Sequence, residues 1–121
     1  MYDISYTPSL ILLIISSSPI SPHQLDPPAE PITICVVDTG YDLGHVDLPQ
    51  LPVQNITGWD TGNANNGVWN VDGHSHGTHC AGSIGALGSN GQGVVGVIDD
   101  PTQFRFHIAK GLSDSGSGAG K

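Results

Sequence analysis

The chain has 121 residues, of which three are lysine or arginine and eleven are aspartate or glutamate, so its formal net charge is −8. That length suffices for one small domain. The acidic balance argues against nucleic acid or an anionic membrane as a partner, because both attract clusters of basic side chains.

The first 30 residues are expected to form a disordered leader or linker, with the domain occupying residues 31–121. Their apolar run, residues 10–15, is much shorter than the ~20 residues that span a bilayer. A secretory signal needs a basic segment at its start, and the first basic residue of this chain is Arg105. Prolines recur from position 19 to position 31, as is typical of a linker without regular structure.

Residues 32–40 (ITICVVDTG) are the first element of the expected domain. The near-continuous apolar run predicts a strand that is buried on both faces of a parallel sheet. The run ends at Asp38, which a Thr-Gly turn follows. Because ligands and catalytic groups collect at the carboxyl ends of strands in open α/β sheets, Asp38 is a candidate catalytic carboxylate.

Residues 74–85 (HSHGTHCAGSIG) predict a helix that packs closely against its neighbours, because small residues recur along it. Ser75 is the expected N-cap, through its hydroxyl group. His76 then lies in the first turn, where the positive end of the helix dipole disfavours an imidazolium ion. A general base at this place needs a carboxylate beside it, and Asp38 is the candidate.

Two blocks of the sequence, VVDTGYDLGHVDL and GHSHGTHCAGSIGA, resemble the aspartate and histidine blocks of the subtilases, the subtilisin-like serine proteases. Their order along the chain matches the family order as well. The resemblance covers about residues 31–121, roughly the first third of a catalytic domain. It implies that Asp38 is the triad aspartate, that His76 is the general base and that His79 is a structural histidine. It also implies a protein or peptide substrate, an extracellular location and no cofactor for catalysis.

The remaining elements predict the fold class. Residues 53–70 predict a short strand and an exposed turn, residues 94–98 an apolar strand, and residues 104–112 a further strand. Strands that alternate with helix are typical of a parallel sheet. Together with the resemblance, this pattern predicts an α/β fold with a partial doubly wound parallel sheet, a fragment of the three-layer α/β/α subtilisin-like architecture.

The resemblance also implies a structural calcium site. An aspartate at the position of Asp47 is a calcium ligand in subtilases, and a loop after the histidine helix completes the site. That loop resembles residues 87–93 here, with Leu87 and Asn90 as the candidate ligands. Its glycines would let several carbonyl groups turn toward one cation, which prefers 6–8 oxygen ligands. The alternative is an exposed acidic loop beside a flexible glycine turn.

Two further places are implied to contact substrate. Asp72 matches a family position that borders the substrate cleft, although a turn residue ahead of the helix is the simpler interpretation. The tail resembles the edge segment that pairs with the substrate backbone, with Gly116, Ser117 and Gly118 as candidates, because glycine suits close approach of another backbone. A flexible Ser/Gly tail is the alternative there.

The nucleophile of the triad is not among these residues. No serine of this sequence lies in a Gly-Thr-Ser-Met-Ala-type block. Losing one triad member leaves weak residual catalysis even when the oxyanion hole is intact. We therefore expect a serine endopeptidase by family, but no proteolysis from this polypeptide alone. A truncated protease that serves as a non-catalytic interaction module is the alternative.

A histidine-cluster zinc site is the alternative from another class of function. His74, His76 and His79 could bind zinc together with Asp72 or Cys80. The H-E-x-x-H signature is absent, because Gly77 occupies the glutamate position.

The two cysteines, Cys35 and Cys80, could form a disulfide or remain as thiols. Inward-facing buried thiols are the favoured interpretation, because free cysteine is among the most buried residue types.

Overall fold

The structure is a computed structural model that describes residues 30–50, 56–60 and 67–118. The leader or linker expected over residues 1–30 lies outside these ranges except for its last residue. Most of the turn expected between residues 61 and 70 lies outside them too. In the described ranges there is no helix long and apolar enough to cross a membrane.

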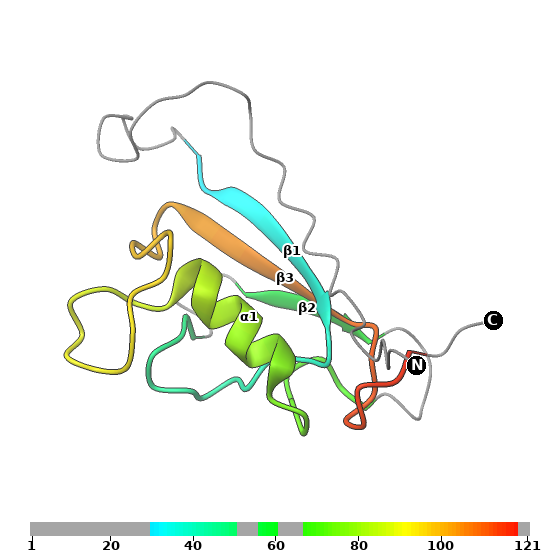
Figure 1. Ribbon diagram of the computed structural model, residues 1–121. Helices are drawn as coiled ribbons and strands as arrows, with labels where there is room; N and C mark the ends of the chain where they lie inside the picture. Colours follow the sequence, from blue (N-terminus) through cyan, green and yellow to red (C-terminus); the bar gives the residue numbers. More distant parts are fainter. Residues whose placement is uncertain (1–29, 51–55, 61–66, 119–121) are drawn as a thin grey trace, which may run out of the picture.

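A parallel sheet of three strands forms the centre of the fold (Figure 1). Strand β1 covers Ile32–Asp38, strand β2 covers Thr57–Asp60 and strand β3 covers Phe104–Lys110. Their spatial order is β1-β3-β2, so β3 lies in the middle and pairs in parallel with both neighbours. The sequence predicted all three strands, and β3 ends two residues before the expected position 112.

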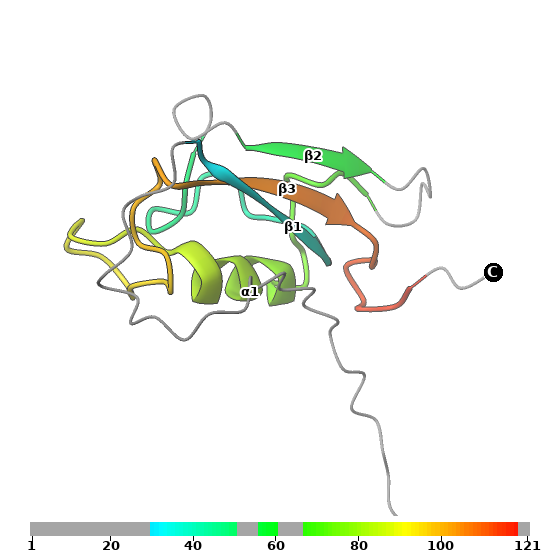
Figure 2. The ribbon, with the colours of Figure 1, turned by 90° about the horizontal axis from the view of Figure 1, so that it is seen from above.

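Helix α1 covers His76–Gly85 and packs on one face of the sheet (Figure 2). Beneath it lies a core of apolar side chains from β3, β1 and the loop that follows β1; its fully buried members include Phe104, Phe106, Ile108, Tyr41 and Leu48. A Cβ atom on Gly85 would stand 2.3 Å from the ring of Phe104, so the helix needs glycine there to pack this close. The close packing predicted from the small residues of this helix is confirmed.

The carboxyl ends of the three strands meet at one edge of the sheet. Asp38 is in register with Lys110 of β3, and Lys110 is in register with Asp60 of β2. The first turn of α1 lies beside the end of β1 (Figure 1). This arrangement brings the two sequence blocks together at the place where open α/β sheets bind ligands.

Strand β1 differs from the expected strand with two buried faces. It pairs with β3 alone in the described part of the chain, and its outward face is exposed at Val37 and Cys35. Helix α1 covers the opposite face, on which Val36 and Asp38 are buried. The described residues therefore form two layers, an α layer and a β layer, of the predicted three-layer fold.

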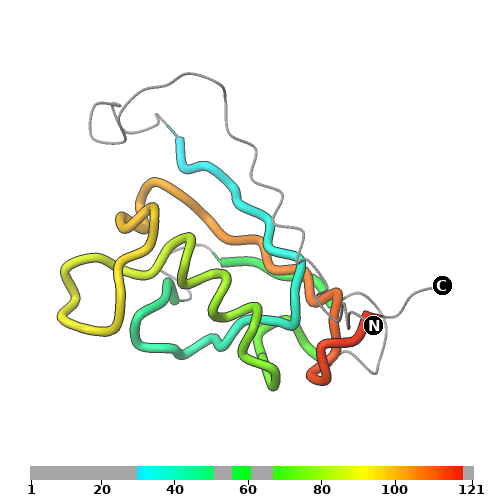
Figure 3. The backbone as a smooth tube through the Cα atoms, in the orientation of Figure 1, coloured from blue at the N-terminus to red at the C-terminus, as the bar shows by residue number. Residues whose placement is uncertain are grey.

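The strand predicted over residues 94–98 is wrong. This segment belongs to the long connection from α1 to β3, which Figure 3 shows in yellow and orange. Its backbone N–H groups bond to the last turn of α1 instead of to a strand: Gly96 donates to Ala86, Val97 to Ser83 and Ile98 to Ile84. They satisfy carbonyl groups that have no partner within the helix. The valine side chains of the segment remain exposed.

Candidate active site

Asp38 ends β1 and is almost wholly buried, with 2 % of the residue exposed. The backbone N–H of Thr39 donates to Asp38 Oδ1 at 2.7 Å. The next two residues of the turn, Thr39 and Gly40, are buried as well. The carboxylate is therefore held in one orientation, with its oxygens toward the start of α1.

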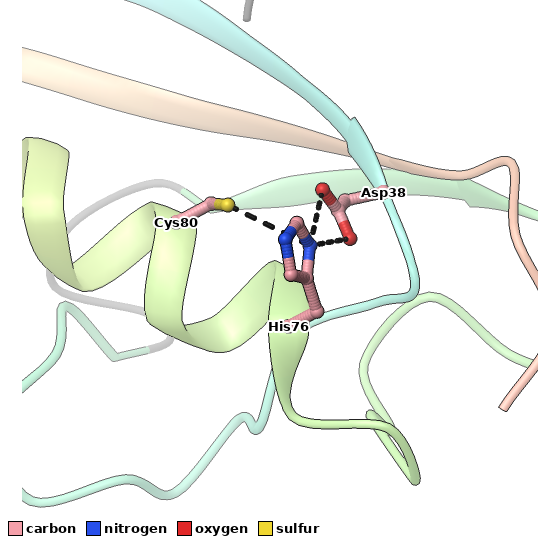
Figure 4. Close-up of side chains that lie close together, drawn as sticks. All are labelled: Asp38, His76 and Cys80. Atoms are coloured by element: carbon pink, nitrogen blue, oxygen red, sulfur yellow. Dashed lines mark hydrogen bonds and ion pairs between the residues drawn. The ribbon is translucent and has the colours of Figure 1, made fainter. Parts of the chain in front are cut away.

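His76 occupies the first position of α1 and faces Asp38 across the junction (Figure 4). Its Nδ1 lies 2.8 Å from Asp38 Oδ1 and 3.0 Å from Oδ2. A carboxylate accepts hydrogen bonds, so in the neutral imidazole Nδ1 carries the proton and Nε2 is the unprotonated nitrogen. The His76 side chain is 42 % exposed, whereas that of Asp38 is 3 % exposed. The structure thus brings a buried carboxylate and a solvent-accessible imidazole into hydrogen-bond contact, as the sequence predicted.

The start of α1 is capped differently from the prediction. Ser75 takes a left-handed conformation with φ 70°, and its hydroxyl makes no capping hydrogen bond. The carboxylate of Asp72 accepts the backbone N–H of Thr78 at 2.8 Å instead. Desolvation raises the pKa of Asp72, but hydrogen bonds from Thr78, Thr39 and Ser75 outweigh it and hold the pKa below its ordinary value. Asp72 therefore caps the helix as an ionised carboxylate, and it is more than a plain turn residue ahead of the helix.

Cys80 lies one turn beyond His76, with its Sγ 3.7 Å from His76 Nδ1 (Figure 4). It is a buried thiol, as expected, whereas Cys35 is an exposed thiol on the open face of β1. The prediction that Cys35 is buried is wrong, because nothing in the described residues covers that face.

The three histidines do not gather into the zinc cluster that was the alternative interpretation. His74 and His79 are exposed, and the rings of His74 and His76 lie 6.1 Å apart between centroids. Within the described ranges, the group with ligand atoms close enough for a metal ion is Asp38, His76 and Cys80.

Asp47 meets the loop after α1, as predicted. It is buried at 3 % exposure and accepts Asn90 Nδ2 and the backbone N–H of Val94, each at 2.8 Å. Its backbone carbonyl accepts the N–H of Leu87 at 3.0 Å. The bond from Val94, followed by the bond from Asn90, holds the pKa of Asp47 below its ordinary value. The simple alternative of an exposed acidic loop is wrong at this residue.

The tail closes into a turn of its own. Gly116 donates to the carbonyl of Ser113 at 2.8 Å, and Ser113 donates to the carbonyl of Ser117 at 3.0 Å. Gly118 forms an antiparallel bridge with Leu112. Gly116 also lies against His74, since a Cβ there would stand 3.0 Å from His74 Nε2. The candidate substrate residues of the tail therefore lie next to the loop that leads into α1.

Lys110 is a site residue that the sequence reasoning missed. Its side chain is 1 % exposed, and its Nζ donates to the carbonyls of Thr39 and Val71 and to Asp114 Oδ1. The bond from Lys110 is the main reason why the pKa of Asp114 lies below its ordinary value. A lysine at the end of an apolar strand, in a chain with three basic residues, was the available signal.

Comparison with known proteins identifies the family of the chain. The family model described as the Subtilase family matches residues 30–119. Subtilisin from Bacillus sp. (strain TA39) is 37% identical over 87 residues, which are 72% of this chain and 20% of the subtilisin. Thermitase from Thermoactinomyces vulgaris is 34% identical over 85 residues, which are 70% of this chain and 28% of the thermitase.

A solved structure is similar as well. The psychrophilic subtilisin-like protease Apa1 from the Antarctic psychrotroph Pseudoalteromonas sp. AS-11 superposes with a TM-score of 0.58 at 39% identity, over 74% of this chain and 20% of that chain. The chain thus spans about a fifth to a quarter of the length of these relatives. It belongs to the subtilase family of serine proteases.

Proposed function

We propose that this chain supplies the aspartate and the histidine of a subtilisin-like serine endopeptidase, and that a serine outside these 121 residues completes the triad. The hydrogen bond between Asp38 and His76 Nδ1 at 2.8 Å carries the proposal. Because Nδ1 donates to Asp38, Nε2 of this half-exposed imidazole is the nitrogen that would accept the proton of a serine hydroxyl. The buried Asp38 charge then stabilises the imidazolium that forms at the positive end of α1.

The substrate class that follows from this proposal is protein or peptide. The acidic balance of the chain, with a formal net charge of −8, gives no support for a nucleic acid or an anionic membrane as a partner.

The test compares the 121-residue chain with the full product of its gene. Both are incubated with a peptide substrate and with a reagent that labels activated serines. We expect hydrolysis and labelling in the full product and neither in the chain alone. Hydrolysis by the chain alone would contradict the proposal. So would a full product that is labelled by the reagent but keeps its activity when His76 is replaced by alanine.

We propose calcium as a structural ligand at Asp47. The donor set fits a hard cation, because a buried carboxylate, the Asn90 carboxamide and a glycine-rich backbone meet there. Asn90 now donates Nδ2 to Asp47 while its Oδ1 accepts the N–H of Gln92, so its amide group would have to turn over to bind the ion through oxygen. The ion would link the loop after β1 to the loop after α1 and would take no part in the chemistry.

An extracellular location is a separate proposal that rests on the resemblance of the sequence blocks. The major intracellular serine protease of Bacillus subtilis (strain 168) is 36% identical over 87 residues, so family membership alone does not decide the compartment. Detection of the protein in culture medium, against a cytoplasmic marker, tests the proposal.

A non-catalytic interaction module is the second candidate function, and the open side of β1 favours it. Ile32 is 55% exposed and Val37 is 57% exposed along a strand whose described partner is β3 alone. Apolar strand edges bind other chains readily. Light scattering should show less association for Val37→Lys than for the unchanged chain; equal association would remove this candidate.

A further inference from the structure

The carboxylate of Asp72 accepts five hydrogen bonds, although the side chain is partly exposed. Oδ1 accepts the hydroxyl of Thr39 at 2.8 Å and the backbone N–H groups of His74 at 3.2 Å and Ser75 at 2.9 Å. Oδ2 accepts the N–H of Thr78 at 2.8 Å and its hydroxyl at 2.6 Å. So many donors on one carboxylate fix its position relative to the loop and to the helix.

The bonds from Ser75 and Thr78 set the start of α1. Helix N–H groups of the first turn have no partner within the helix, and an anion there also suits the helix dipole. Ser75 takes a left-handed conformation with φ 70°, and its hydroxyl makes no capping bond. Left-handed conformations are uncommon outside glycine. Asp72 therefore supplies the cap and also fixes the unusual Ser75 conformation that leads into His76.

The bond from Thr39 links the same carboxylate to the end of β1. The Thr39 hydroxyl donates to Asp72 and accepts the backbone N–H of Gly77 at 3.0 Å. The N–H of Thr39 donates to Asp38 Oδ1 at 2.7 Å. The residues on either side of the Asp38–His76 hydrogen bond are thus joined through Thr39 to one anion.

We propose that Asp72 is the positioning residue of the site: it holds the first turn of α1 against the end of β1 so that His76 Nδ1 stays in hydrogen-bond contact with Asp38. The inference rests on the proposed function for its catalytic meaning. The five bonds of Asp72 come from Thr39, His74, Ser75 and Thr78. Its effect passes through the backbone of residues 75–78 and through Thr39. Because a displacement of ~1 Å at a catalytic group can cost ~100-fold in rate, such a device matters for catalysis.

The test measures the tautomer of His76 in the 121-residue chain by nitrogen NMR of labelled histidine rings, with His76→Ala to identify its signals. The unchanged chain should show mainly the Nδ1–H form, because Asp38 accepts that proton. Asp72→Ala should lose roughly half or more of the Nδ1–H population, since the ring is then released from Asp38. Asp72→Asn, which keeps one accepting oxygen, should fall between the two.

Asp100→Ala is the matched control. Asp100 also accepts several hydrogen bonds in a loop, from the N–H and hydroxyl of Thr102 and from Gln103, but it lies ahead of β3 and away from the site. It should leave the His76 tautomer unchanged. Amide exchange in β1 and β3 reports whether each variant keeps the sheet. If Asp72→Ala loses the sheet, the His76 tautomer in Asp72→Asn decides whether Asp72 has the positioning role.

The variant Asp38→Asn distinguishes a failure of the positioning role of Asp72 from a failure of the proposed function. If Asp38→Asn leaves the tautomer unchanged, the Asp38–His76 pair itself is wrong and the proposed function fails. If Asp38→Asn shifts the tautomer while Asp72→Ala and Asp72→Asn do not, the pair stands and the positioning role of Asp72 is overturned. An equal shift with Asp100→Ala would overturn it too.

Discussion

Gly77 lies so close to Gly40 that a Cβ atom on Gly77 would stand 2.3 Å from the Gly40 carbonyl oxygen and 3.1 Å from Asp38 Cβ. The first turn of α1 therefore touches the turn after β1, backbone to backbone. Gly77→Ala should push the two apart and lower stability by ~1–3 kcal/mol, the usual cost of overpacking. Thermal unfolding measures the change.

Gly82→Ala is the matched control within the same helix. A Cβ there would meet Leu48 at 3.7 Å, which is an ordinary contact. Alanine in a helix interior is favoured over glycine by up to ~1 kcal/mol, so this variant should be neutral or stabilising. If both variants behave alike, close packing at Gly77 is not what holds the helix in place.

Calcium should raise the melting temperature of the chain, because an ion that binds the native state alone stabilises it by mass action. Asp47→Asn should abolish the response by removing the buried charge, whereas Asp100→Asn should keep it. Thermal melts with calcium and with a chelator measure the difference. A response that survives in Asp47→Asn would place the ion elsewhere.

The two thiols should differ in reactivity. Burial, followed by the negative charge of Asp38, raises the pKa of the Cys80 thiol. Since the thiolate is the reactive form, an alkylating reagent at neutral pH should modify the exposed Cys35 first and Cys80 at least ~10-fold more slowly. Peptide mass mapping over time gives both rates. Equal rates would show that the helix does not shield Cys80.

Acid should destabilise the protein through the carboxylates at its loops. The pKa values of Asp72 and Asp47 lie below their ordinary value in the folded state. Their contribution to stability is complete above the unfolded pKa of about 3.9 and is lost as the pH falls through the lower, folded values. Melting temperatures at a series of pH values should show this loss. Asp72→Asn should be less stable at neutral pH and should lose less on acidification; an unchanged acid response would contradict the assignment.

The sequence predicted those parts of the site that the pattern of neighbouring residues in the chain determines. Asp38 follows an apolar strand and His76 opens a helix of small residues, so neighbours in the sequence reveal both. The cap was expected from Ser75, but Asp72, three residues earlier in the same loop, supplies it. What its neighbours in the sequence do not reveal is the bond from Thr39, which lies 33 residues away in the chain and helps to fix the Asp72 carboxylate.

The failures in the fold have a similar cause. The segment from Val94 to Ile98 is apolar, but its N–H groups bond to the last turn of α1 and to Asp47. Cys35 is exposed because the described strands leave one face of β1 uncovered, which its own sequence does not reveal.

Whether Asp38 and His76 form the catalytic pair is tested most directly by the kcat of the full gene product with Asp38 replaced by asparagine. We expect kcat to fall by about 10⁴-fold, the size of the effect when a triad aspartate is replaced by asparagine, because an amide NH₂ group that donates to Nδ1 would hold His76 in the wrong tautomer. Asp100→Asn should leave kcat unchanged. A full product whose Asp38→Asn variant keeps kcat within roughly tenfold of the unchanged enzyme would contradict the claim that Asp38 and His76 form the catalytic pair.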